Sequence, residues 1–345
     1  MKRSQKTWLF AALFVTLLLT VILATAVGAV AIPADVTLRI ILSQLGMPWI
    51  ETGDIGRNTE AIVWSLRLPR VLLGVLIGAS LALAGSTFQG LLRNPLADPF
   101  TIGVSSGAAT GATIAIFLSQ LNGLHFPHMI PLFAFTGALL AFFFVYNLSK
   151  IGGQIPVVTL LLSGVVVSSF LSAVISLLMV FAGENIKGIF FWLSGGLMMR
   201  SWTEIGFVAP YLLLGFCLIF AYARELNILL LGEEAALHLG VRVDFTKKLL
   251  LVTASLVTAA AVSVSGMIGF VGLIIPHAVR MVSGPDHRVL LPASALVGGI
   301  FLVWADVVAR TVMAPREIPV GIITAFIGAP FFIYLLRKKK KEIRL

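Results

Sequence analysis

Charged residues are scarce in this sequence, and their scarcity excludes a soluble domain. Only 12% of the 345 residues are charged and 59% are hydrophobic, and the mean hydropathy is +1.03. Soluble globular domains carry about 25% charged residues. The net charge of +10 is therefore better explained by anchoring at a membrane surface than by binding to nucleic acid.

Several motifs of catalysis and metal binding are also missing. The single cysteine, Cys217, excludes an intramolecular disulfide and argues against a cysteine metal site. The chain has no GxxxxGK[ST] phosphate loop for ATP. Its histidines show no metal-ligand spacing and form no recognisable Ser/His/Asp set: His125, His128, His238, His277 and His287. We therefore expect no catalytic residues, no metal site and no cofactor in this chain.

Long apolar runs are what the sequence has in place of these motifs. About twenty apolar residues are needed to cross the hydrocarbon core. The runs predict an all-α polytopic membrane protein, one transmembrane domain over residues 1–345, and Gly266, Gly269 and Gly272 predict a turn between two spans. The predicted spans, about ten in number, lie near residues 8–31, 68–92, 100–118, 129–148, 156–182, 205–223, 249–265, 267–282, 289–309 and 320–336.

The lysines and arginines gather at alternate ends of the predicted spans. Because cytoplasmic segments of membrane proteins carry the excess of these residues, the bias predicts that both termini and residues 224–248 are cytoplasmic. The basic tail after residue 336 lies on the same side.

Ionisable residues are rare in the middle of the predicted spans. The acids nearest to spans, Asp98, Glu204, Asp306 and Glu317, all fall close to span ends. Ion-coupled secondary transporters place acids, histidines or lysines at mid-membrane, where these groups load and unload. The pattern favours a transporter whose energy enters elsewhere. An ion-coupled secondary transporter stays as the alternative, and a membrane-embedded enzyme is a weaker one.

One polar stretch, LGEEAALHLGVRVDFTKK at residues 231–248, separates two apolar runs. Glu233 and Glu234 stand where negative charge favours a helix N-terminus, and Gly240 stands where a helix would end. Between them lie small and apolar residues: Ala235, Ala236, Leu237 and Leu239. A solvated connection is the ordinary interpretation, but a short helix of this composition is typical of a docking element for another protein.

The segment GEEAALHLGV resembles the coupling segment of permease subunits of ATP-binding-cassette (ABC) importers for iron–siderophore complexes, haem and cobalamin, the FecCD-type family. Three other segments carry the resemblance over most of the chain. They are RLPRVLLGVLIGASLALAGSTFQGLLRNPLADPFTIGVSSGA at 67–108, SGMIGFVGLIIPHAVR at 265–280, and ADVVARTVMAPREIPVGIITAFIGAPFFIYLL at 305–336.

The resemblance implies a type II importer permease in the cytoplasmic membrane of a bacterium or archaeon, together with its partners. These are a second permease subunit, in a homodimer or sometimes a heterodimer, two cytoplasmic ATPase subunits that bind ATP and Mg, and an extracytoplasmic binding protein. The translocation path would follow the dimer axis. ATPase coupling would fall to Glu233, Glu234, Ala236, Leu237, Leu239, Gly240 and Val241.

Arg67 and Arg70 lie three residues apart in RLPR, on one side of a helical turn. Arginines at a span end often reach the lipid headgroups with their charged tips, which is one interpretation. The resemblance implies a second, in which these two residues and Arg310 dock glutamates of the binding protein. Arg316 and Lys187 are weaker candidates for the same contact.

The resemblance also implies a cytoplasmic gate in two turns of the chain. Asn94 and Leu96 lie in RNPLADP, and Val157 and Val158 lie in IPVVT at the constriction positions. The valines depart from the small hydroxyl residues of cobalamin-type members and suit a gate that closes by dewetting, although two β-branched residues that begin an ordinary span explain them equally well.

Polar residues inside two predicted spans are candidates for the lining of the translocation path. They are Gln89, Ser163, Ser168, Ser169 and Ser172, and close helix packing explains them as well. The cargo cannot be read from such a path. A ferric siderophore is our first expectation, followed by haem and cobalamin.

Overall fold

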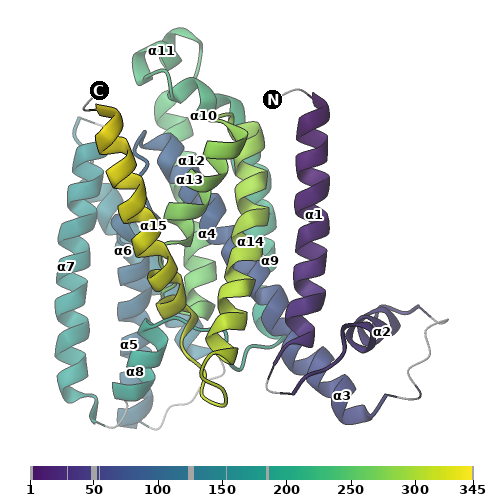
Figure 1. The fold of residues 1–345 in the computed structure, drawn as a ribbon. Coiled ribbons are helices and arrows are strands. Elements are labelled where there is room, and N and C mark those ends of the chain that lie inside the picture. The colour runs from purple at the N-terminus through teal and green to yellow at the C-terminus, as the bar shows by residue number, and fades with distance from the viewer. Residues whose placement is uncertain are drawn as a thin grey trace.

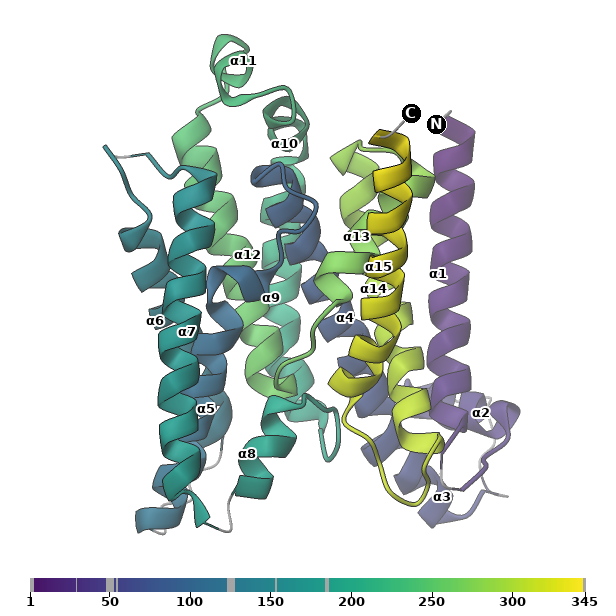
Figure 2. The same cartoon turned by 60° about the vertical axis from the view of Figure 1, so that its left-hand side comes forward.

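The computed structural model describes residues 3–343 apart from 29, 48–52, 54, 123–127, 153, 184 and 185. This described part is a bundle of long helices joined by short helices and turns (Figures 1 and 2). The elements are α1 (Arg3–Ala26), α2 (Ala34–Gln44), α3 (Arg57–Ala61), the π-helical η1 (Ile62–Arg67), α4 (Leu68–Leu91), the 3-10 helix η2 (Pro99–Ile102), α5 (Val104–Asn122), α6 (Met129–Leu148), α7 (Val157–Phe181), α8 (Ile186–Leu193), α9 (Trp202–Ala221), α10 (Ala223–Leu229), α11 (Glu233–His238), α12 (Val243–Ser265), α13 (Val271–Ser283), α14 (His287–Thr311) and α15 (Val320–Ile343).

The ten-span prediction agrees with these helices. Within the described residues, seven helices are long and apolar enough to cross a membrane. Three shorter apolar helices, at Val104–Ser119, Val271–Ser283 and Val320–Tyr334, occupy the places of the remaining predicted spans. The all-α polytopic fold class is therefore confirmed.

The bundle has a buried centre and an open periphery. In the apolar windows of α4 and α12, 83% and 78% of the residues are buried, against 22% in α1 and 11% in α7. Glycines let the central helices approach closely: a Cβ built on Gly78 would collide with the backbone of Gly298, and one on Gly85 with Gly272. The exposed sides of α1 and α7 must therefore be covered by lipid or by other protein.

The predicted glycine turn separates α12 from α13. Gly266 has φ 70° and Phe270 has φ 69°, so the chain leaves α12 in a left-handed conformation that suits glycine. The broken backbone is covered by protein, because the amide of Gly196 donates to the Ser265 carbonyl at 2.7 Å. Membrane proteins tolerate irregular backbone at such depth where it is paired in this way.

The two ends of the bundle carry different short elements. One end, the α11 end, holds α10, α11 and both chain termini; the other, the α8 end, holds α2, α3 and α8 (Figures 1 and 2). The predicted common side of the termini and residues 224–248 agrees with this arrangement. The sequence analysis missed α2, which stands away from the bundle and packs Ile40 with Ile32 and Val63.

Candidate functional site

α11 is a short helix that stands clear of the bundle (Figure 2). It begins after Gly232, whose φ of 117° only glycine adopts easily. Glu233 and Glu234 occupy its first turn, and Gly240 follows its end with φ 80°. The predicted helix, its acidic start and its glycine end are therefore present.

The side chains of α11 divide between the bundle and the solvent. Ala236 is fully buried and Val241 nearly so, whereas Leu237 and Leu239 are 60% and 58% exposed. A leucine exposed to that extent on a six-residue helix gains nothing from burial within this chain. The exposed leucines give α11 and its C-terminal end an apolar surface that a partner protein could cover.

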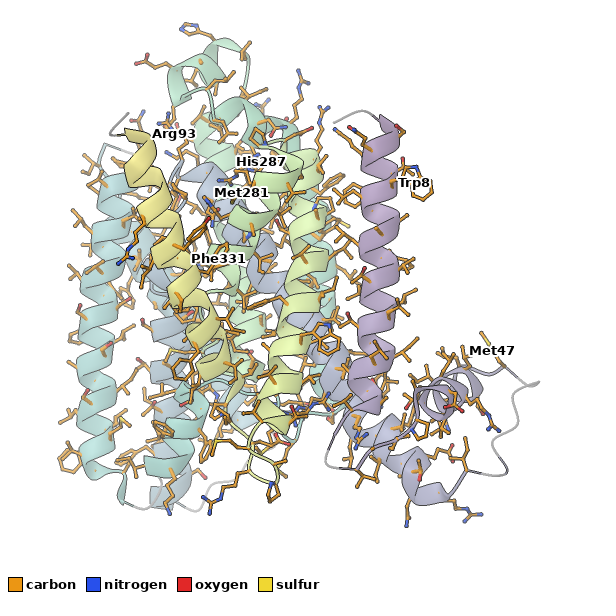
Figure 3. All side chains as sticks on the ribbon, viewed as in Figure 1. Trp8, Met47, Arg93, Met281, His287 and Phe331 are labelled. Atoms are coloured by element: carbon orange, nitrogen blue, oxygen red, sulfur yellow. The ribbon has the colours of Figure 1, made fainter. Side chains whose placement is uncertain are left out.

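α10, the helix that precedes α11, is attached to the rest of the bundle by a cluster of polar side chains. Asn227 of α10 donates to Asp286 at 2.8 Å, and Lys6 of α1 pairs with the same carboxylate at 3.3 Å. The amide of His287, labelled in Figure 3, donates back to the Asn227 side chain at 2.8 Å. Burial alone would raise the pKa of Asp286, but hydrogen bonds from Asn227 and Arg288 and the charge of Lys6 lower it below its usual value.

The predicted gate residues lie in two turns. The Asn94 side chain accepts a hydrogen bond from the Leu96 amide at 2.9 Å, which closes the turn after α4. Val157 and Val158 form the first turn of α7 after Pro156. Leu96 is 46% and Val158 67% exposed. Their gating role stays a prediction; the structure shows apolar side chains directed away from the chain's own core.

Asp98, in the same turn as the gate residue Leu96, is a buried carboxylate. It caps η2 and accepts a hydrogen bond from the Phe100 amide at 2.9 Å. Burial raises the pKa of Asp98 to about 6, and the Phe100 hydrogen bond lowers it only in part. The sequence analysis placed Asp98 near a span end and did not foresee its burial.

The three predicted docking arginines are turned inward at the α8 end. Arg67 donates to the carbonyls of Ala26 at 2.9 Å and Thr25 at 3.3 Å, and to that of Val30. Arg310 donates to the carbonyl of Ala24. Both guanidinium groups thus satisfy carbonyls at the C-terminal end of α1, where a helix leaves acceptors without partners and favours positive charge.

Arg70 belongs to a buried ion-pair network beside these two. Its guanidinium donates to the Asp306 carboxylate through three hydrogen bonds of 2.8, 3.0 and 3.2 Å and contacts Glu317 at 2.9 Å. The Arg310 guanidinium lies 3.7 Å from the same Asp306 carboxylate. The docking role of Arg67, Arg70 and Arg310 stays a prediction, since each already holds internal partners.

A cavity of about 680 Å³ opens at the α8 end, and no pattern in the sequence predicted it. It lies between α8, the segment after α8 and the α14–α15 connection, and its lining includes Trp192, Met198, Arg200, Arg316 and Glu317. Arg316 and, on α8, Lys187 are exposed. These two cations are available to a partner in a way that Arg67 and Arg310 are not.

The predicted lining residues fall into two groups. Gln89 is buried and donates to the carbonyls of Gly272 and Leu273 at 3.2 and 3.0 Å, so it fixes α4 against α13. Ser163 is buried, Ser168 is half-buried, and Ser169 and Ser172 are exposed on α7. Only the last two face outward, and their lining role stays a prediction. Among the described residues no group of three His, Cys, Asp or Glu side chains is placed to hold a metal ion.

Comparison with known proteins gives one consistent result. The sequence model of the FecCD transport family matches residues 16–338. The cobalamin import system permease protein BtuC of Halobacterium salinarum is 50% identical over 90% of this chain and 86% of its own length. The hemin transport system permease protein HmuU of Yersinia pestis is 40% identical over 81% of this chain and 84% of its own.

The fold is shared with a solved transporter. A metal-chelate type ABC transporter in an inward-facing conformation matches with a TM-score of 0.82 and 32% identity, over 96% of this chain and 99% of that one. The match extends over nearly the whole length of both chains, so the arrangement of the long helices is common to them.

Proposed function

The chain belongs to the FecCD transport family, and on that premise we propose how it takes part in ATP-driven import. It is a multi-pass permease of the class that serves ABC importers of iron chelates, haem or cobalamin, and not an enzyme. In our proposal it works in the cytoplasmic membrane with two cytoplasmic ATPase subunits, which bind ATP and Mg, and with an extracytoplasmic binding protein. Both termini and α11 face the cytoplasm, in line with the lysine and arginine bias.

The observation that carries this proposal is the exposed apolar face of α11. Leu237 and Leu239 project from a helix that is itself anchored through α10 and through buried Ala236. Covering such leucines is favourable by about 1.5–3 kcal/mol each. An ATPase subunit that covers these leucines would bind a helix that is itself attached to the bundle through α10 and Ala236. Movement of the ATPase could therefore be transmitted to the bundle.

A second copy of the chain is the partner that the open side of α7 supports. Only 11% of the apolar window of α7 is buried within the chain, and its exposed residues include Ser169 and Ser172 as well as Val158. Hydroxyl groups on a lipid-facing helix gain little, whereas a path between two subunits hydrates them. We therefore place the translocation path between two α7 helices, with Val158 at its cytoplasmic gate.

The cargo we propose is a ferric siderophore, in agreement with the sequence-based expectation. Cobalamin is the second candidate because the Halobacterium relative named for its import is 50% identical to this chain. Haem is the third, on the likeness to the hemin permease. The three differ in size and chemistry, so parallel uptake measurements separate them.

The test is uptake by the complete importer in proteoliposomes, with its ATPase, its binding protein, and a ferric siderophore, haem or cobalamin outside. We expect ATP-dependent accumulation of the siderophore that persists when the proton gradient is collapsed. Leu237→Asp should weaken ATPase binding about tenfold to a hundredfold, since it removes the free energy of burying one leucine. Co-purification of the ATPase and uptake should fall together.

Leu45→Asp is the matched control, because Leu45 is 66% exposed but lies at the α8 end. It should leave both measurements unchanged. Normal co-purification and uptake for both Leu237→Asp and Leu239→Asp would reduce α11 to a solvated connection. Accumulation by this chain alone, driven by a proton or sodium gradient, would establish the secondary transporter instead.

A further inference from the structure

Lys247, in the second turn of α12, is a buried lysine next to an exposed one. Its side chain is 6% exposed, whereas that of Lys248 lies in solvent. The Lys247 ammonium donates to the Glu233 carboxylate at 2.9 Å and to the carbonyl of Ile155 at 3.0 Å. A buried ammonium is costly unless it is paired, so the two partners account for its presence.

These partners belong to two segments that are far apart in the sequence. Glu233 is the first residue of α11. Ile155 follows a tight hairpin, in which Ile151 and Gln154 bridge each other, and directly precedes Pro156, the residue before α7. One ammonium group thus joins the exposed helix α11 to the start of α7.

The start of α7 has apolar contacts but few polar ones. Ile155 and Leu160 are buried in the main apolar core of the bundle. Pro156 has no amide hydrogen to donate, and the Thr159 hydroxyl donates to the Ser149 carbonyl at 3.0 Å, within the same connection. The helix that follows is the least buried of the long apolar helices in the described part of the chain, at 11% against 78% for α12. The Lys247 hydrogen bond is therefore the polar contact that ties the start of α7 to α12 and α11.

We propose that Lys247 is a positioning residue that carries a displacement of α11 to the start of α7. This inference rests on the proposed function, in which α11 receives the ATPase and Val158 in the first turn of α7 forms the gate. The lysine is suited to the task because its ammonium has three donors, so it holds a carboxylate on one segment and a carbonyl on the other at once. Movement of Glu233 then moves Ile155.

The test follows the hairpin before α7 without any cargo. In a Cys217→Ser background of the complete importer, Gln154→Cys places a thiol on the exposed Gln154 position, and its maleimide labelling rate is measured with and without ATP and vanadate. We expect ATP and vanadate to change this rate in the Lys247-containing protein. Lys247→Met removes both of its hydrogen bonds, to Glu233 and to Ile155, and should reduce the change about tenfold or more.

Two variants separate positioning from a general structural role. Lys248→Met makes the same chemical change one residue away and should leave the ATP-dependent labelling intact. Lys247→Arg keeps the donors and the charge, and should restore most of the response that Lys247→Met loses. ATPase co-purification should be normal in both Lys247 variants, because Lys247 lies beneath α11 and not on its exposed face.

Each result decides the question. An undiminished labelling change in Lys247→Met overturns the inference and leaves the proposed function standing. No labelling change with native Lys247 overturns the proposed gate and the inference with it. If Lys247→Met fails to assemble, Glu233→Ala removes the acceptor for the Lys247 ammonium at a half-exposed residue, and a full labelling response in that variant rejects the proposal.

Discussion

At the α11 end of the bundle the two predicted coupling leucines face outward, whereas at the α8 end the predicted docking arginines face inward. Leu237 and Leu239 are more than half exposed, but Arg67 and Arg310 are 9% and 7% exposed. An apolar residue in solvent and a cation in the interior are both unfavourable in an isolated chain. A partner protein would relieve the first, as our proposal requires, and the second is already relieved inside the chain.

The inward arginines show what a charge at a span end can do without any partner. The last turn of α1 leaves carbonyls without amide partners, and Arg67 at the end of η1 and Arg310 on α14 supply the missing donors. Trp8, at the other end of α1, points away from the bundle (Figure 3). α1 is therefore held at its C-terminal end by guanidinium groups as well as by the packing of Ala24 with Val71, Val303 and Val307.

The strongest test of this difference is Arg67→Met. It removes donors to three carbonyls while it keeps an apolar side chain of similar length, and it should lower the free energy of unfolding by about 3 kcal/mol or more. The measurement is the thermal midpoint of the purified chain in detergent.

Arg57→Met is the control for Arg67→Met, because Arg57 is exposed at the same end and a surface substitution changes stability by about 0.5 kcal/mol or less. Equal midpoints for Arg67→Met and the unmodified chain would return Arg67 to the docking interpretation. A large loss of stability would mean that charge reversal at Arg67 cannot be used to measure docking.

Two buried carboxylates extend the comparison. Asp306 at the α8 end lies between Arg70 and Arg310, whereas Asp98 accepts one hydrogen bond, from the amide of Phe100. The pKa of Asp98 is raised from 3.8 to about 6 by burial. A raised carboxyl pKa means that the neutral form stabilises the fold below about pH 4, and that this contribution is lost as the pH rises through about 6.

Asp98→Asn should therefore stabilise the protein, and more at about pH 7.5 than at about pH 4.5. The amide keeps the acceptor for Phe100 and removes the charge, so the gain above pH 6 has an upper limit of about 3 kcal/mol. Thermal midpoints across this pH range measure it. A gain that is the same at both pH values would show that Asp98 is not neutral at low pH in the folded chain.

Local patterns in the sequence located the long helices and α11. Span length depends on the thickness of a membrane, and the ends of α11 depend on Gly232, Gly240 and two adjacent glutamates. The long-range hydrogen bonds and ion pairs that engage the charged side chains could not be predicted from such local patterns. Arg70 and Asp306 are 236 residues apart, Arg67 binds backbone carbonyls that leave no trace in residue type, and Lys247 reaches a carbonyl 92 residues away.

The exposed cations of the α8 end give the smallest expected effect. If a binding protein docks there through charge, Arg316 and Lys187 are the residues that can meet it without losing internal contacts. Each exposed ion pair contributes about 1 kcal/mol or less, so the loss of two pairs in Lys187→Glu with Arg316→Glu should weaken capture of the binding protein by about thirtyfold or less at low salt, and by less at high salt. Lys248→Glu, at the α11 end, is the matched control and should have no effect. Binding titrations of the assembled importer at two ionic strengths measure the change, and unchanged capture at low salt would show that the partner is held by something other than these two charges.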